Sequence, residues 1–460
     1  MEKKRIESDS MGKLEVAADA LYGPQTQRAV NNFPISGQKL PEDFIRALLI
    51  AKSAAANANK SLKQLPIEMA DSIQKAIEIL LNDKKLMNHF PVDIFQTGSG
   101  TSTNMNANEV IAKIASKEYG KPVSPNDHVN YGQSSNDIIP STIHISSSIG
   151  LEFKLLPALL HLSSVTKAKA QKLDDHVKTG RTHLMDAMPI RLSQTLEGWA
   201  EQIDLNISRL KGLQPQLQTL AQGGTAVGTG INAHSKFART FTSALNEKTD
   251  LKFSPANNFF SHIGSQDIAV SLSGQLKTTA VSIMKIANDL RWMNSGPLAG
   301  LGEIELEALQ PGSSIMPGKV NPVIPEAAAM VCAQVIGNDS AVTVAGQSGN
   351  FELNVMLPMI ANNLLNSINF LSNVSYLLAD KAIKSFSVNE KKLTETLSRN
   401  PILVTALNPI IGYLKAAEIA KKAYKENRPI IDVASEQTDL SVEELKKLLN
   451  PTKLTQGGLS

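Results

Sequence analysis

The stretch Gly312-Ser-Ser-Ile-Met-Pro-Gly-Lys-Val-Asn-Pro322 stands between two long helical patterns, and the rest of the chain is organised around it. Gly312, Pro317 and Gly318 are incompatible with a regular helix, so the stretch is predicted to form a loop. Glycine lets a backbone turn its N–H groups inward, so this loop can present amide donors beside its hydroxyl, ammonium and carboxamide groups. The combination suits a small, multiply charged anion, or a reaction in which negative charge builds on a carboxylate. A surface spacer between helices would not need it.

The apolar run that follows this loop predicts a buried helix that begins near Pro325 and carries Glu326 in its first turn. The single cysteine, Cys332, lies within the same apolar pattern, so we expect a buried, unreactive thiol rather than a nucleophile. A lone cysteine cannot form an internal disulfide, and its solitude is typical of a reducing compartment.

Composition narrows the class of protein. The chain has 460 residues, of which 42% are hydrophobic and 19% charged, and its formal net charge is +3. This balance is ordinary for a globular protein of more than one domain and gives no reason to expect a nucleic-acid partner. The first ten residues contain no apolar signal core, and no uninterrupted run of 18 apolar residues occurs. We therefore expect a cytoplasmic protein with no membrane span.

Helical patterns dominate the chain. A weak hairpin pattern at the N-terminus precedes helices predicted at 43–62, at 66–87 and from about residue 107. The middle of the chain carries long apolar stripes at helical spacing, for example Leu272, Leu276, Ala280, Ile283, Ala287 and Leu290. Polar loops are predicted at 178–188, 222–234 and 295–322. Shorter helices are predicted in the tail at 389–398, 412–425 and 441–449, the last of them capped by Ser441.

The predicted fold class is therefore all-α, in three regions. These regions are a mostly helical N-terminal domain (1–136), a central bundle of long helices (137–387) and a small C-terminal helical domain (388–460). One central helix carries an asparagine stripe at 362, 366, 369 and 373 beside its apolar stripe. Asparagine is poor material for a solvated helix surface, because its amide competes for backbone hydrogen bonds. We expect this helix to pack against partner subunits.

Four more polar loops share the chemistry of the first. Thr97-Gly-Ser-Gly-Thr-Ser-Thr-Asn104 resembles a phosphate-binding loop, but no Gly-Lys-Ser/Thr follows, so a P-loop is excluded. A helix cap with spare hydroxyls is the plainer interpretation. Gln133-Ser-Ser-Asn-Asp137 precedes a helix whose N-terminus favours anions, although one of its residues could simply be the cap.

The third loop, 178–186, holds His183 beside Arg181 and Thr182 in a turn rather than on an apolar face, so structural and catalytic roles both stay open. The fourth, 223–232, has four glycines and fits either a flexible connector or a close backbone approach. The eight histidines show no metal-ligand spacing, and neither a Rossmann fingerprint nor a Gly-x-Ser-x-Gly elbow occurs. We expect no metal site.

Together the motifs GSSIMPGKVNP, TGSGTSTNMNANEV, GQSSND, GRTHLMDAMP and GGTAVGTGIN resemble the fumarase/aspartase superfamily, and most closely its class II fumarases. The resemblance runs from about Ser8 to Tyr413. It implies an all-α fold of three domains, a homotetramer with a shared central bundle, and active sites assembled from loops of three subunits. It also implies a small dicarboxylate substrate (fumarate or L-malate), reversible hydration as the reaction, and no cofactor.

The resemblance also assigns roles by position. The implied catalytic residues are Ser313 as the base, His183, and Glu326 as the carboxylate that pairs with His183. The implied substrate-binding residues are Ser99, Gly100, Thr101, Ser134, Ser135, Asn136, Thr182, Ser314, Lys319, Val320 and Asn321. A secondary dicarboxylate site would fall at Ser124, Pro125, Asn126 and Asp127. Ser124 stands where the family commonly has histidine, which puts occupancy of that secondary site in doubt.

Two alternatives remain from the sequence. Val323-Ile-Pro-Glu326 looks more like aspartate ammonia-lyase, whereas His183, Gly318 and the run from Gly223 look like fumarase. A non-catalytic helical scaffold of the same fold is the other alternative, and the intact loop residues argue against it.

Overall fold

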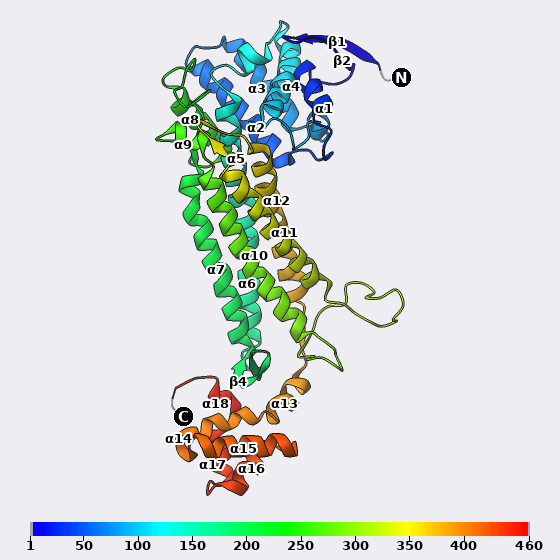
Figure 1. Cartoon of the computed structure of the whole chain (residues 1–460), viewed down its shortest axis with the longest axis vertical. Coiled ribbons are helices and arrows are strands. Elements are labelled where there is room, and N and C mark those ends of the chain that lie inside the picture. Colours follow the sequence, from blue (N-terminus) through cyan, green and yellow to red (C-terminus); the bar gives the residue numbers. More distant parts are fainter. Residues whose placement is uncertain (1–2, 459–460) are drawn as a thin grey trace. The chain divides into compact units, whose positions relative to one another are not determined.

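The computed structural model describes residues 3–458 and is mostly helical (Figure 1). By its internal contacts the chain divides into two compact units, each discontinuous in sequence. Unit 1 comprises residues 1–157, 206–280 and 332–372, and unit 2 comprises 158–205, 281–331 and 373–460. The boundary falls within five helices: α6 (Leu156–Lys172), α7 (Leu192–Leu217), α10 (Asp267–Met293), α11 (Val323–Gly346) and α12 (Leu357–Leu378). The three-region division made from the sequence stays a prediction.

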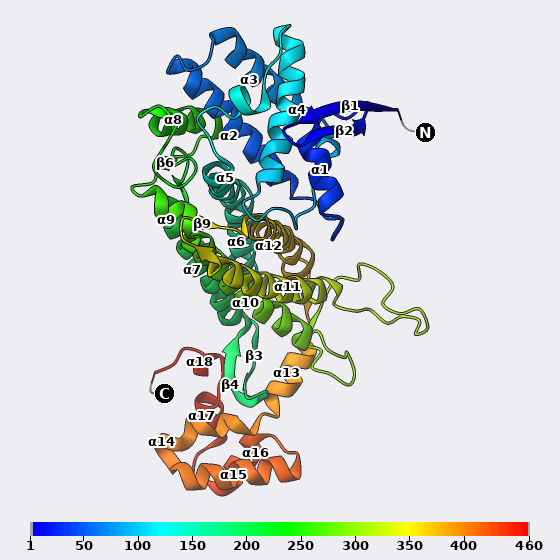
Figure 2. The same cartoon turned by 45° about the horizontal axis from the view of Figure 1, so that its top comes forward.

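Unit 1 begins with an antiparallel hairpin, as expected, in which β1 pairs with β2. The elements of this unit are β1 (Lys4–Asp9), β2 (Gly12–Ala17), α1 (Pro24–Asn32), α2 (Glu42–Ser61), α3 (Ile67–Leu81), η1 (Leu86–His89), α4 (Thr101–Tyr119), η2 (Pro125–Val129), α5 (Ser135–Gly150), η3 (Leu151–Leu155), β5 (Thr219–Leu220), α8 (Phe237–Thr249), β6 (Ser254–Pro255), α9 (Phe259–Gly264), β8 (Gly349–Asn350) and β9 (Leu353–Asn354). Figure 2 shows the hairpin beside α1 and α4.

Helix α2 is the centre of unit 1, packed against α3, α5 and α8. Its alanines at 51, 54, 55 and 58 are fully buried, and their small side chains let the neighbouring helices approach closely. Helix α4 begins six residues earlier than predicted. Its asparagines are tolerated inside the helix because their side chains find distant partners: Asn104 and Asn108 donate to Asn130, and Asn106 donates to the His89 carbonyl.

The long apolar stripes occupy the core as predicted. Leu272, Leu276, Ala280, Ile283, Ala287 and Leu290 of α10 are each at most 1% exposed. The asparagine stripe of α12 is partly satisfied within unit 1, since Asn366 donates to Asn362 (3.0 Å) and Asn369 donates to Asp43 (2.9 Å). Asn373, at the end of the stripe, is exposed.

Unit 2 contains the short elements β3 (Val177–Thr182), β4 (Met185–Arg191), β7 (Ile304–Glu305), η4 (Ala379–Ile383), β10 (Ser387–Val388), α13 (Glu390–Ser398), η5 (Pro401–Leu407), α14 (Asn408–Ile411), α15 (Tyr413–Glu426), α16 (Ile430–Gln437), α17 (Val442–Leu448) and α18 (Pro451–Leu454). The three helices predicted in the tail are confirmed, as is the Ser441 cap, which forms a capping box with Glu444. The prediction of a loop at 178–188 was wrong, because these residues form the β3–β4 hairpin.

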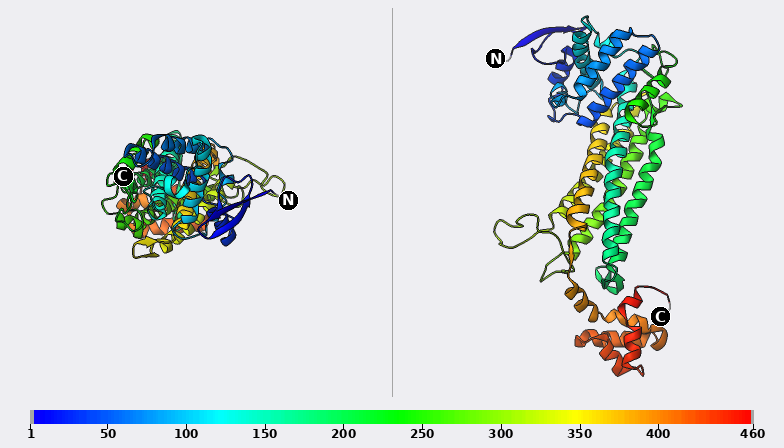
Figure 3. Two further views of the ribbon diagram at one scale, coloured as in Figure 1. Left: turned by 90° about the horizontal axis from the view of Figure 1, so that it is seen from above. Right: turned by 180° about the vertical axis from the view of Figure 1, so that it is seen from behind.

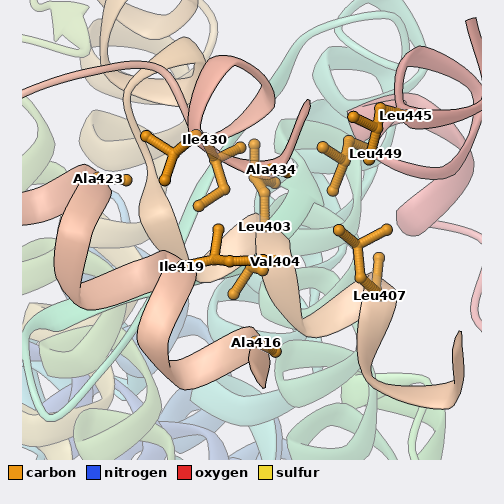
Figure 4. Close-up of a cluster of buried hydrophobic side chains, with 12 residues drawn as sticks. Leu403, Val404, Leu407, Ala416, Ile419, Ala423, Ile430, Ala434, Leu445 and Leu449 are labelled. Carbon is orange, nitrogen blue, oxygen red and sulfur yellow. The ribbon is translucent and has the colours of Figure 1, made fainter. Parts of the chain in front are cut away.

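The C-terminal elements of unit 2 enclose their own core. Figure 4 shows Leu403 and Val404 of η5 meeting Ile419 of α15, with Ile430 of α16 and Leu445 of α17 on the opposite side. All five side chains are at most 4% exposed, so this small module has a continuous hydrophobic interior.

Two helices are long and apolar enough to cross a membrane by length and composition alone: the continuous helix Ser135–Lys172, and Val323–Gly346. Counting uninterrupted apolar runs in the sequence did not reveal them. In the first, 67% of the most apolar window is buried, as in a core helix, whereas only 33% of that window is buried in α11.

The Cys332 thiol is expected to resist alkylation in the native protein. The residue is fully buried in α11, and burial raises the pKa of the thiol to about 12, so the reactive thiolate is scarce at pH 8. Iodoacetamide labelling at pH 8, followed by mass spectrometry, should be on the order of 1,000-fold slower in native than in urea-unfolded protein. Rapid labelling of folded protein would contradict the buried, unreactive assignment.

Candidate active site

The first predicted binding loop ends at the N-terminus of α4 in unit 1. Gly100 is the N-cap residue, with a φ of 70° that favours glycine, and the Gln96 side chain accepts the Thr103 amide of the first turn at 2.9 Å. The Ser99 and Thr101 hydroxyls instead lie 2.8 Å apart, hydrogen-bonded to each other. The simple cap interpretation of these hydroxyls is therefore wrong. They lie at a helix N-terminus, where an anion is favoured.

The loop is held against the start of α12 by its backbone. The Gly98 carbonyl accepts a hydrogen bond from the Leu357 amide at 3.0 Å, and a Cβ at residue 98 would lie 1.7 Å from the Val355 carbonyl oxygen. Only glycine permits this approach without displacing one of the two segments.

Gly98→Ala should therefore displace the loop and destabilise unit 1 by about 1–3 kcal/mol or more. Gly198→Ala is the matched control, since residue 198 lies within α7 with nothing near a new Cβ and should be neutral or slightly stabilising. Thermal denaturation of both variants tests this expectation. Equal melting temperatures would show that the loop is not fixed by this contact.

The second predicted loop forms the N-terminus of α5. Ser134 is the cap, and the Asp137 carboxylate accepts a hydrogen bond from the Ser134 amide (2.9 Å), so the two residues form a capping box. The side chain of Asn136 is partly accessible, and its amide donates to the Ala226 carbonyl at 2.8 Å. The glycine-rich segment 222–232 therefore lies beside this loop, which settles its role as a close backbone approach rather than a free connector.

Asp137 holds the glycine-rich segment beside the loop through buried hydrogen bonds. Its carboxylate accepts hydrogen bonds from Gln222 Nε2 (3.0 Å), the Gly223 amide (3.0 Å) and the Thr225 amide (2.9 Å). Lys52, buried on α2, instead donates to Asn130 and Gln133, just before the loop. Neither role was evident from the sequence, because the partners lie more than 70 residues away in the chain.

Thr182 and His183 lie at the tip of the β3–β4 hairpin in unit 2. His183 (φ 56°) and Leu184 (φ 61°) are the two central residues of the turn, both in left-handed conformations that side chains other than Gly, Asn and Asp adopt at a cost. All of Thr182, His183, Leu184 and Met185 are exposed.

Ion pairs fix the base of this hairpin. Glu303, 3% exposed, accepts from Lys178 Nζ at 2.6 Å and from Arg181 at 2.7 Å. Breaking such a buried pair is costly, so the strand that carries Thr182 is rigidly placed while its tip stays accessible. The α13 helix also packs against β3.

The 312–322 stretch is an ordered loop between α10 and α11, which projects from these helices in Figure 3. It is closed by hydrogen bonds from the Gly312 amide to the Lys319 carbonyl (2.9 Å) and from Asn321 Nδ2 to the Gly312 carbonyl (2.6 Å). Residues 308–313 and 316–320 line an open hollow of about 410 Å³.

Ser313 is distinguished within this loop. Its Oγ accepts backbone N–H groups from Met316 (2.9 Å) and Ile315 (3.2 Å). Two donors on one oxygen stabilise negative charge there. Ser314, Lys319 and Val320 are exposed, whereas the Gly312 amide is already engaged with Lys319 and is not free for a ligand.

Glu326 lies in the first turn of α11, which begins at Val323, two residues before the predicted start. Within residues 3–458 no hydrogen bond or ion pair joins Glu326 to His183, and none joins either residue to 312–321. The loops of unit 1 are thus organised by their own contacts, and so are those of unit 2. Their convergence in one site stays a prediction.

The predicted secondary site adopts a local fold. Ser124 caps η2: its hydroxyl accepts from the Asp127 amide (3.0 Å) and donates to Asp127 Oδ2 (2.8 Å). Pro125 and Asn126 line part of a 480 Å³ hollow shared with β1 and α4. In residues 3–458 no group of three or more His, Cys, Asp and Glu side chains is arranged to hold a metal ion.

Comparison with known proteins identifies the family. Residues 12–337 match the family described as Lyase, and residues 403–456 match Fumarase C C-terminus. The chain is 68% identical over its whole length to fumarate hydratase class II 2 of Pseudomonas aeruginosa, and the match covers 100% of both chains. The chain belongs to the class II fumarase family.

Other class II fumarases support the same assignment. The enzyme of Xylella fastidiosa is 57% identical, with 100% of this chain and 97% of the relative covered. The crystal structure of recombinant class II fumarase from Schistosoma mansoni superposes with a TM-score of 0.95 at 36% identity, covering 98% of this chain and 99% of that one. The predicted fold class is therefore confirmed as a mostly helical fumarase-like fold.

Proposed function

We propose that the protein catalyses the reversible hydration of fumarate to L-malate, a step of the tricarboxylic acid cycle. The observation that carries the proposal is full-length identity of up to 68% to class II fumarate hydratases, together with intact polar loops in ordered conformations. The lone buried cysteine is in keeping with a cytoplasmic location. Small dicarboxylates are the proposed ligands.

In the malate-to-fumarate direction, Ser313 removes the proton from the carbon next to a carboxylate. A serine hydroxyl is ordinarily far too weak an acid for this role, but the two amides on Ser313 Oγ favour its alkoxide. The malate dianion thereby becomes a trianionic intermediate, which is stabilised by Lys319, by Asn321 and by backbone and hydroxyl donors around it. The hydroxyl group then departs as water, after it receives a proton from His183.

His183 acts at the leaving oxygen, with Glu326 as the carboxylate that tunes it. The remaining predicted residues bind the substrate carboxylates: Ser99, Gly100, Thr101, Ser134, Ser135, Asn136, Thr182, Ser314 and Val320. The loops at 99–101 and 134–136 place these groups at two helix N-termini, where anions are favoured.

We further propose a homotetramer of three-domain subunits, in which three subunits contribute to each site. Helix α11 supports this arrangement, because it is strongly apolar while only 33% of its most apolar window is buried within one chain. Met330 is 68% exposed, and at the loop tip Ile315 is 82% exposed. Within residues 3–458 no hydrogen bond or ion pair joins His183 to Glu326, as expected if their partners come from other copies.

Ultraviolet absorbance of fumarate formed from L-malate or from L-aspartate tests the reaction. Turnover of L-malate alone is expected. Release of fumarate from L-aspartate would instead favour an ammonia-lyase, which Val323-Ile-Pro-Glu326 resembles. If neither acid reacts and no C4 dicarboxylate raises the melting temperature, the protein is a non-catalytic scaffold.

A further inference from the structure

Two opposite charges are buried beneath the loop that carries Ser134, Ser135 and Asn136. Lys52 of α2 is 1% exposed and Asp137 of α5 is fully buried, both within unit 1. Charged side chains are rarely buried this completely without a specific role, because removing them from water is costly.

The Lys52 ammonium holds the segment just before the loop. Its Nζ donates to Asn130 Oδ1 (3.0 Å) and to Gln133 Oε1 (2.9 Å), and Asn130 in turn donates to the Gln133 carbonyl (3.1 Å). Asn104 of α4 reaches both Asn130 Oδ1 (3.2 Å) and the Ser135 hydroxyl (2.9 Å). The Lys52 ammonium therefore orders the segment between η2 and α5.

Asp137 holds the loop from the opposite direction. It fixes the Ser134 amide and three donors of the 222–225 segment, which in turn places the Ala226 carbonyl on Asn136. Lys52 and Asp137 therefore restrain the 133–137 loop through separate sets of hydrogen bonds.

Stability alone does not account for this arrangement. Burial lowers the pKa of Lys52 to about 7 and raises that of Asp137 to about 6, so desolvation opposes the charged form of both side chains. Replacing two buried opposite charges together by apolar side chains is often neutral or stabilising, whereas removing only one of them is destabilising. The free energy lost by burying Lys52 and Asp137 is understandable if substrate binding depends on the geometry of the 133–137 loop.

We infer that Lys52 and Asp137 are positioning residues that preorganise Ser134, Ser135 and Asn136 for a substrate carboxylate, so that Lys52 sets substrate affinity rather than the rate of the chemical step. The inference rests on the proposed function for the identity of the substrate. Lys52 itself touches no substrate, and its positive charge adds to the field of the α5 N-terminus above it.

Lys52→Met tests the inference, since methionine has similar length but neither charge nor donors. We expect KM for L-malate to rise by about 10-fold or more while kcat changes by less than about 3-fold, as for an interaction made equally in ground and transition states. Lys60→Met is the matched control: it lies on the same helix, but its ion pair with Asp71 is solvent-exposed, and its KM should be unchanged. Circular dichroism and melting temperature establish folding.

If Lys52→Met does not fold, Gln133→Leu still tests the inference, because it removes one hydrogen-bond acceptor of Lys52 and keeps the Lys52 side chain. KM should rise in this variant too, by a few-fold. A folded Lys52→Met with unchanged KM, or with reduced kcat at unchanged KM, would overturn the inference. Fumarate binding by isothermal calorimetry separates the two proposals: wild-type protein that binds fumarate without turnover contradicts the proposed function, and a Kd unchanged in Lys52→Met contradicts the positioning role.

Discussion

Ser313→Ala is expected to lower kcat for L-malate dehydration by about 100-fold or more with folding intact. The substitution removes the hydroxyl that would take the proton, and it also frees the Ile315 and Met316 amides that now bind Ser313 Oγ. KM should change far less than kcat, because Lys319 and Asn321, which are proposed to bind the substrate carboxylate, remain. Initial rates by fumarate absorbance, with circular dichroism as the folding check, provide the measurement.

A second substitution separates proton transfer from loop structure. Asparagine at 313 can accept the same two amides in an Asx turn, but it offers no hydroxyl. Ser313→Asn should therefore keep the turn and remain as inactive as Ser313→Ala. Near-normal turnover in either variant would remove Ser313 from the chemistry and leave it a turn residue.

His183→Asn should reduce kcat by a similar factor, about 100-fold or more, through loss of the group that serves the leaving oxygen. Asparagine is the suitable replacement, because residue 183 has a φ of 56° and asparagine tolerates left-handed backbone better than most side chains. The hairpin itself should persist, since Glu303 anchors it through Lys178 and Arg181.

His161→Asn is the control for histidine loss in general. His161 pairs with Asp380 and contacts the Tyr376 ring, neither of which is a predicted site residue, and its replacement should leave kcat within about twofold of wild type, as for an exposed ion pair. If His183→Asn behaves like His161→Asn, the hairpin tip has no catalytic function.

Helical periodicity predicted most of the fold, because each long helix buries one continuous apolar stripe. The stripe from Leu272 to Leu290 illustrates this, since all its members lie in the core. The β3–β4 hairpin was missed because its turn residues are His183 and Leu184. Two-residue hairpin turns usually contain Asn-Gly or Asp-Gly, which can be recognised in a sequence.

The candidate site was predictable in its loops but not in its supports. Hydroxyl and amide residues stand together in sequence around Ser313 and Ser134, with Lys319 beside the first, so local composition reveals them. Lys52, Asp137 and Glu303 act through partners far away in the chain, for example 125 residues between Lys178 and Glu303. Only the folded structure brings such partners together, and a single sequence gives no signal for them.

The central claim, that each site is shared between subunits, is tested most directly by mixing two inactive variants. Ser313→Ala and His183→Asn are unfolded together in equal amounts and refolded, beside each variant refolded alone. If residues 183 and 313 of one site come from different subunits, random assembly restores both native residues in about a quarter of the sites, with activity to match. Activity no higher than that of the separate variants would show that both residues act from the same chain and would contradict the account.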